Sequence, residues 1–234
     1  MLSNLPLYIT LFFLLTVMLT FFLFWRMMNR RFGKINYNWY NFLIIMLWLT
    51  LQLGLTLAGV YINGNDSLPP NILIYGVAPA LVTILMLFML KKGRDFINGL
   101  SILDLTIIHL VRIPVEIVLY LLFLYKAVPK LMTFEGQNLD VLMGITSILV
   151  VYLLARGKIT KSWLIAWNII GLLFLFNIIG TALLSAPSPL QKLAFDQPNV
   201  AIFYFPFSWL PTFVVPIVLF SHLATLHKLS KNIS

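Results

Sequence analysis

The stretch "HLVRIPVEIVLY", residues His109 to Tyr120, places a histidine, an arginine and a glutamate in an otherwise apolar segment. Apolar residues continue on both sides of it. Ionisable side chains are costly in hydrocarbon, so within a membrane helix they face the bundle interior or a wet cavity. The stretch therefore predicts a membrane helix whose charged side faces inward.

The composition of the whole chain indicates a membrane protein. Of its 234 residues, 61% are hydrophobic and 10% are charged, and the mean hydropathy is +0.97. Apolar runs of roughly 20 residues, each long enough to cross a bilayer core, recur along the chain. They lack the polar–apolar alternation of barrel strands. The sequence predicts an all-α polytopic transmembrane helix bundle that forms a single domain over residues 1–234.

Seven spans are expected, at residues 5–25, 39–62, 71–90, 100–125, 139–155, 162–185 and 201–225. Twelve of the sixteen lysines and arginines lie on one side of these spans. They are Arg26, Arg30, Arg31, Lys34, Lys91, Lys92, Arg94, Arg156, Lys158, Lys161, Lys228 and Lys231. Basic residues gather in cytoplasmic loops, so the amino terminus is expected outside and Ser234 in the cytoplasm. The same rule explains the net charge of +9 without a nucleic-acid partner.

The fourth span carries four ionisable residues on one face. At about 100° per residue, Asp104, His109, Arg112 and Glu116 fall within an arc of about 140°. Two interpretations remain open. Arg112 and Glu116, four residues apart, are spaced to neutralise each other as a structural pair. Alternatively, the four residues belong to a ligand or substrate site, with Arg112 as the contact for an anionic group.

Two further segments are expected on the same side of the membrane as Glu116. The string "TFEGQNLD", residues 133–140, contains Glu135 and Asp140, which are candidates for the rim of a pocket. It is also a candidate helix cap, through Asn138 or Asp140. The long segment 185–200 is a candidate lid, and Trp209 a candidate for the apolar wall.

Several classes of site are excluded by residue type and spacing. The chain has no cysteine, which rules out disulfides and thiolate metal sites. A retinal Schiff base would require a lysine in the last helix, and the chain has none between Val200 and His227. His222 is expected near the depth of Asp104 and several turns from His109, which argues against a haem between the two histidines. No cofactor and no metal are predicted.

The strings "RIPVEIVLYLLFLYKAVPKLMTFEGQNLD" and "SAPSPLQKLAFDQPNVAIFYFPFSWLPTFVVPIVLFSHL" resemble those of an uncharacterised bacterial family of seven-helix integral membrane proteins. The resemblance covers nearly the whole chain. It implies a location in the bacterial inner (cytoplasmic) membrane. It brings no activity, so no functional role passes to any residue.

The leading hypothesis is an outward-facing intramembrane pocket that binds a polar or anionic small ligand or a lipid headgroup. His109, Arg112, Glu116, Glu135, Asp140 and Trp209 are the expected ligand-binding residues. A small-solute or proton-coupled transporter is the alternative, because midplane charge beside a breakable helix is typical of transporter sites. A lipid-modifying enzyme ranks third, since no nucleophile–base pair can be named. Membrane lipid is the expected partner, and the oligomeric state is left open.

Overall fold

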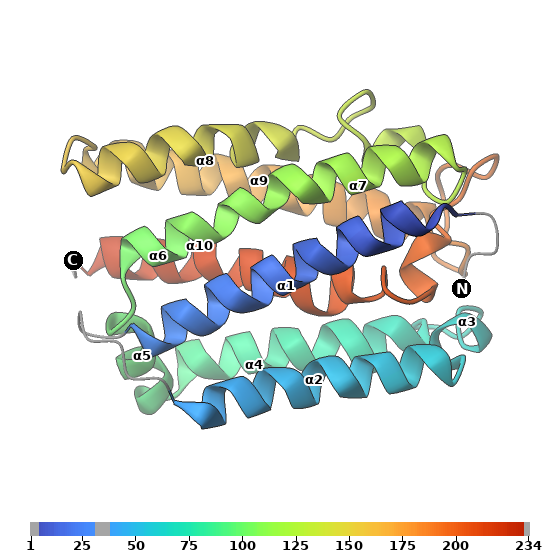
Figure 1. Cartoon of the computed structure of the whole chain (residues 1–234), viewed down its shortest axis with the longest axis horizontal. Coiled ribbons are helices and arrows are strands. Elements are labelled where there is room, and N and C mark those ends of the chain that lie inside the picture. The colour runs from blue at the N-terminus through green and yellow to red at the C-terminus, as the bar shows by residue number, and fades with distance from the viewer. Residues whose placement is uncertain (1–4, 31–37, 232–234) are drawn as a thin grey trace.

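The computed structural model describes residues 5–30 and 38–231. Within these ranges the regular secondary structure is entirely helical, in agreement with the predicted fold class. Three residues named above, Arg31, Lys34 and Ser234, lie outside the described residues. Figure 1 shows the long helices running along a common axis, with successive long helices in opposite directions.

The long helices correspond in order to the expected segments, with shifted ends. The elements are α1 (Leu7–Asn29), α2 (Trp39–Leu57), α3 (Val60–Asn63), η2 (Leu73–Val77), α4 (Ala78–Met89), α5 (Lys91–Asn98), α6 (Ile102–Ile108), η3 (His109–Val111), α7 (Arg112–Leu124), η4 (Lys130–Met132), α8 (Asp140–Ala155), α9 (Lys161–Ser185), η5 (Ala201–Phe203), η6 (Leu210–Val214) and α10 (Val215–Ser230). The largest shift is at the last long helix, which begins at Leu210 rather than at residue 201.

Five of the described helices are long and apolar enough to cross a bilayer. They are Leu7–Asn29, Trp39–Leu57, Ile102–Leu124, Lys161–Ser185 and Leu210–Ser230. The pair Leu73–Met89 and Lys91–Asn98 meets the same criteria only when taken together, and it bends by 88° at its break. The helix Asp140–Ala155 is apolar but shorter.

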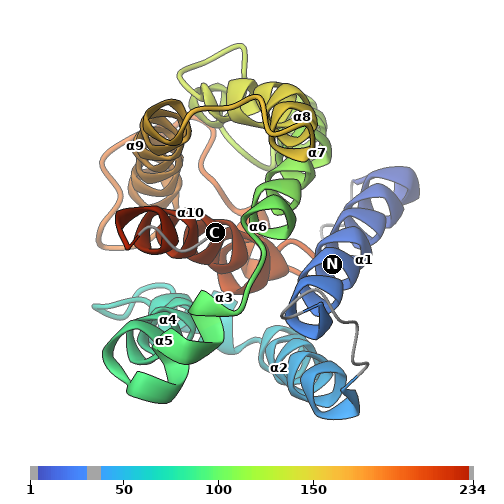
Figure 2. The ribbon, with the colours of Figure 1, turned by 90° about the vertical axis from the view of Figure 1, so that its left-hand side faces the viewer.

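The last helix is the centre of the bundle. Of its most apolar 18-residue window, 72% is buried, against 22% for the corresponding window of Trp39–Leu57. Figure 2 shows α10 in the middle, with α6, α9 and α4 around it. Large apolar side chains on the outer faces of α2, α8 and α9 are exposed, as a lipid-facing surface requires.

Two prolines explain two irregular turns beside the core. Proline has no N–H, so Pro79 and Pro216 cannot donate to the carbonyls four residues earlier, those of Tyr75 and Thr212. At both places the backbone widens into a π turn, η2 and η6. Helix α2 supplies the missing donors. Gln52 Nε2 donates to the Tyr75 carbonyl at 3.1 Å, and Trp48 Nε1 donates to the Thr212 carbonyl at 2.9 Å.

The two π turns also lie against each other. A Cβ added to Gly76 in η2 would come within 2.4 Å of Thr212 Cγ2 in η6. Only a residue without a side chain allows this approach. Helices α2, α4 and α10 are therefore joined at one level of the bundle by backbone contact and by side-chain donors.

The end of the bundle that carries α5 and the last turn of α10 is held by basic side chains. Lys228 Nζ donates to the carbonyls of Asn98 and Leu100 at 2.8 and 2.6 Å. Asp104 lies 3.5 Å from Arg30 and 3.9 Å from Arg26, both contributed by the α1 segment. His222, expected near the depth of Asp104, does not bond to this carboxylate, which these two arginines contact instead.

If α2 supplies the donors that two prolines remove, Trp48→Phe should destabilise the protein by about 1–3 kcal/mol, the cost of an unpaired buried carbonyl. In Pro216→Ala the restored N–H gives the Thr212 carbonyl a local donor, so Trp48→Phe should cost less in that background. Thermal unfolding in detergent micelles, arranged as a double-mutant cycle, measures the difference. Trp163→Phe, at an exposed indole, is the control. Equal costs of Trp48→Phe in both backgrounds would contradict the assignment.

Candidate functional site

All four ionisable residues of the α6–α7 segment are buried, as the angular spacing predicts. The partner of Arg112 differs from the expected one. Its Nη1 lies 2.8 Å from Asp140 Oδ1 at the start of α8, and its side chain is 2% exposed. Glu116 makes no ion pair with Arg112. The interpretation of Arg112 and Glu116 as a self-neutralising pair is therefore wrong.

Pro114 lies two residues after Arg112 and shapes the backbone before it. It has no N–H for the carbonyl of Leu110, and the preceding residues His109–Val111 form a single 3₁₀ turn, η3. The Arg112 N–H closes this turn on the His109 carbonyl. The break lies where α6 ends and α7 begins, so it sets the direction in which the guanidinium leaves the helix.

A chain of polar contacts runs from Arg112 through two more helices, α10 and α9. Arg112 Nη2 lies 2.9 Å from His222 Nε2, and His222 Nδ1 lies 2.8 Å from Asn168 Oδ1. Arginine only donates, so Nε2 accepts and Nδ1 carries the proton that is donated to Asn168. Asn168 Nδ2 donates in turn to the Leu164 carbonyl at 2.8 Å. His222 is therefore a neutral link between α7, α9 and α10.

His109 stacks on this link. Its ring centroid lies 4.0 Å from that of His222, and Trp167 meets it edge-on at 5.2 Å. Neither ring nitrogen of His109 has a hydrogen-bond partner among the described residues. The expected separation of the two histidines by several turns is wrong. The last long helix starts at Leu210 and not at residue 201 as expected. His222 therefore lies nearer to the middle of this helix. The two stacked imidazole rings lie too close together for a haem to fit between them.

Glu116 is bound by Asn138, which lies two residues before the start of α8. Asn138 Nδ2 lies 2.7 Å from both Glu116 oxygens. Asn138 Oδ1 accepts from the Asp140 N–H at 3.0 Å, so Asn138 pairs a first-turn N–H of α8 as expected, although the N-cap position itself is Leu139. One asparagine thus positions both buried carboxylates, those of Glu116 and Asp140.

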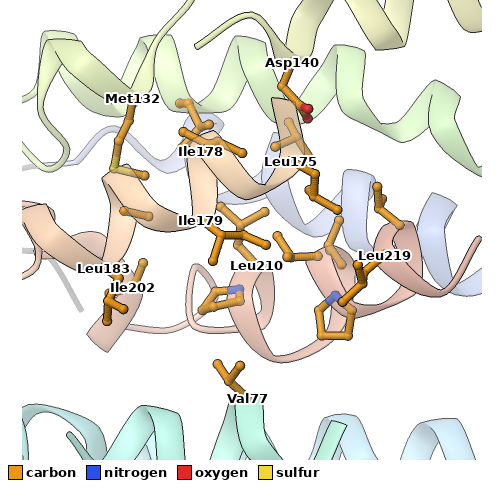
Figure 3. A pocket seen from close by; sticks show the side chains of 18 of the residues that line it. Val77, Met132, Asp140, Leu175, Ile178, Ile179, Leu183, Ile202, Leu210 and Leu219 are labelled. Atoms are coloured by element: carbon orange, nitrogen blue, oxygen red, sulfur yellow. The ribbon is translucent and has the colours of Figure 1, made fainter. Parts of the chain in front are cut away.

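Arg112, Glu116 and Asp140 line a cavity of about 220 Å³. The rest of its wall is almost entirely apolar, and most of it comes from α7, α9, α10, η2 and η6. Figure 3 shows Leu175, Ile179 and Leu183 of α9 on one side, Leu210 and Val77 on the other, and the Asp140 carboxylate directed toward the cavity. The cavity therefore has a polar end and an apolar body.

The exposed side chains of the wall indicate where the cavity opens. Phe176 of α9 is 55% exposed and Leu81 of α4 is 42% exposed, and both line it. Arg112, Glu116 and Asp140 are buried at its inner end. The opening consequently lies on the side of the bundle, between α9 and the η2–α4 segment.

The segment 185–200 lies at the end of this cavity that is remote from α5. Ala186 and Ser188 are part of the wall. Gln197 Nε2 donates to the carbonyls of Phe123 and Val128 at 2.9 and 2.7 Å, and the Asn199 N–H donates to Ser185 O at 2.8 Å. These bonds fix the candidate lid to α7 and α9, and its Ala186 and Ser188 form part of the cavity wall.

The other three expected site residues lie outside the cavity lining. Glu135 is partly exposed and pairs with Lys130 at 3.8 Å. Trp209 is turned toward α2, where its Nε1 donates to the Leu49 carbonyl at 3.2 Å. His109 stacks on His222 and does not reach the cavity. No sequence pattern marks the apolar wall, because its leucines and isoleucines resemble those that face lipid.

The polar chain depends on a glycine. A Cβ on Gly171 would come within 2.4 Å of His222 Cε1, so Gly171→Ala should displace the imidazole from Arg112 and Asn168. We expect a loss of about 1–3 kcal/mol of stability, as for other overpacked sites. Gly180→Ala on the same helix is the matched control, because its Cβ meets nothing within 4 Å. Thermal unfolding in micelles compares the two variants. Equal stability would show that His222 is not held as described.

Comparison with known proteins gives a family but no activity. No curated protein and no solved structure matches the chain. Residues 69–230 match a family model, and this range holds the whole cavity lining, the lid and the polar chain from Asp140 to Asn168. The chain therefore belongs to the family described as "Domain of unknown function (DUF8737)".

Proposed function

We propose that the protein binds a membrane amphiphile in this cavity. The polar head lies at Arg112, Glu116 and Asp140, and the apolar chain extends between α9 and α4. The single observation that carries the proposal is the cavity itself, which has three ionisable residues at one end and apolar walls elsewhere. Such a combination of apolar lining and a few convergent polar groups is typical of ligand sites.

The side opening supports an amphiphile rather than a water-soluble ligand. A molecule that enters between α9 and α4 comes from the bilayer hydrocarbon, which contacts the exposed apolar faces of these helices. Its chain is already in an apolar medium there. Specificity then comes from the head, because a buried polar group that finds no partner costs about 1–3 kcal/mol.

The proposal includes seven spans with the amino terminus outside, in a bacterial inner membrane. Two helices beyond the five long ones complete this count, Leu73–Met89 and Asp140–Ala155. A 16-residue helix is roughly 24 Å long, slightly shorter than a hydrocarbon core of about 30 Å. The basic helix α5, the α8–α9 turn and the last turn of α10 lie at one end of the bundle, which supports a cytoplasmic assignment for that end (Figure 1).

Reporter fusions test this topology. A fusion after Ser230 should be active only with a cytoplasmic reporter, and one inserted near Gly136 only with an external reporter. The reason is the concentration of basic residues at the α5 end of the bundle. External activity of the carboxyl-terminal fusion would reverse the orientation.

Binding is tested by blocking the cavity. Ala182 of α9 lines it, so Ala182→Phe should fill the space beside the apolar body and exclude the bound molecule. Ala166→Phe, at an exposed position of the same helix, is the matched control. Native mass spectrometry of the purified protein should show an amphiphile on the wild type and on Ala166→Phe, and at least tenfold less on Ala182→Phe. Equal occupancy of all three proteins would place the molecule elsewhere.

Transport of a small solute or a proton is a second candidate, favoured by one observation. Both π turns contribute to the cavity wall, through Val77 of η2 and Leu210 of η6. Interrupted helices at a binding site are common in transporters. Proteoliposomes with an imposed pH gradient distinguish the candidates: pure binding predicts identical proton fluxes for the wild type and Glu116→Gln, whereas transport predicts a loss in the variant.

A further inference from the structure

Two of the five N–H donors of Arg112 are engaged, one on each terminal nitrogen. Nη1 is bound to Asp140 and Nη2 to His222. The remaining nitrogen, Nε, is buried without a hydrogen-bond partner among the described residues. The guanidinium thus has its charge matched by a carboxylate at 2.8 Å. Arg112 therefore has no unmatched positive charge to offer an anionic ligand, contrary to its expected role as an anion contact.

Glu116 is in the opposite situation. A carboxylate offers about four lone-pair positions. The hydrogen bonds of Glu116 in the described structure come from one nitrogen, Asn138 Nδ2. Glu116 therefore retains acceptor capacity, and it lines the cavity.

The acidic and basic groups at the polar end are unequal in number. The ionisable residues of the lining are one arginine and two acids, Arg112, Glu116 and Asp140. His222 next to them is neutral in the tautomer that its contacts require. Lys130, a cation of the neighbouring loop, is exposed and paired with Glu135. One carboxyl group at the inner end of the cavity is consequently without a matching positive charge.

We propose that the head of the bound amphiphile is an ammonium group with N–H donors, which pairs with Glu116. This inference rests on the proposed function and specifies its ligand class. An ammonium supplies both the missing charge and the missing donors. A metal ion is less suited, since no group of three or more His, Asp or Glu in the described residues could hold one.

Three amphiphiles that share a fourteen-carbon chain test the head group: tetradecylamine, tetradecanol and myristate. Each is titrated into the purified full-length protein in a non-ionic detergent at neutral pH, and occupancy is read by native mass spectrometry. We expect the amine to bind at least tenfold more tightly than the carboxylate, with the alcohol between them. Glu116→Gln should reduce the advantage of the amine over the alcohol about tenfold. Glu135→Gln, which removes an acid outside the cavity, should leave it unchanged.

The outcomes separate the two proposals. If none of the three compounds binds the folded wild type, both the amphiphile site and its head-group assignment fall. If all three bind equally, or myristate binds best, the ammonium inference is overturned while the proposed function stands. The relative affinities of the three compounds for the wild type test the ammonium inference even if Glu116→Gln fails to fold. An unchanged ranking in a folded Glu116→Gln protein would remove Glu116 as the partner.

Discussion

A buried guanidinium is the constraint on which the interior of this bundle depends. Burial of an unpaired charge in an apolar medium is prohibitive, so Arg112 must bring its partners with it. Asp140 supplies the charge and His222 an acceptor, and Asn168 fixes the tautomer that lets His222 accept. Four helices are thereby set in register by a single side chain. The register needs a close approach of α9 to α10, which Gly171 permits.

The same logic of unpaired polar groups applies to the backbone. In an apolar surrounding, each carbonyl that proline leaves without a donor must find one elsewhere. At Tyr75 and Thr212 the donors are side chains of α2, whereas before Pro114 the helix tightens into a 3₁₀ turn. The backbone therefore accommodates its prolines in two ways, by side-chain donors from α2 and by a local 3₁₀ turn. The turn lies next to Arg112, and the two π turns lie at the wall of the cavity.

The sequence predicted the helical class and the inward face of the fourth helix, because both follow from composition and local spacing. The partners of Arg112 lie 28 and 110 residues away, and no local pattern reveals them. The depth of His222 was missed because an apolar, proline-rich stretch does not mark where its helix begins. The cavity wall was missed because apolar residues that face a cavity and those that face lipid have the same composition.

The hydrogen bonds from α2 bear on how the family match is understood. The matched region begins at residue 69, after α2 has ended. Yet Trp48 and Gln52 bond to backbone carbonyls inside that region, and Arg26 and Arg30 contact Asp104, also inside it. When taken by itself, the matched region therefore lacks hydrogen-bond or ion-pair partners for Tyr75, Asp104 and Thr212, among other residues. The helices that these contacts join therefore extend beyond the matched region, and removal of α1 and α2 from this chain would leave buried polar groups of that region without their partners.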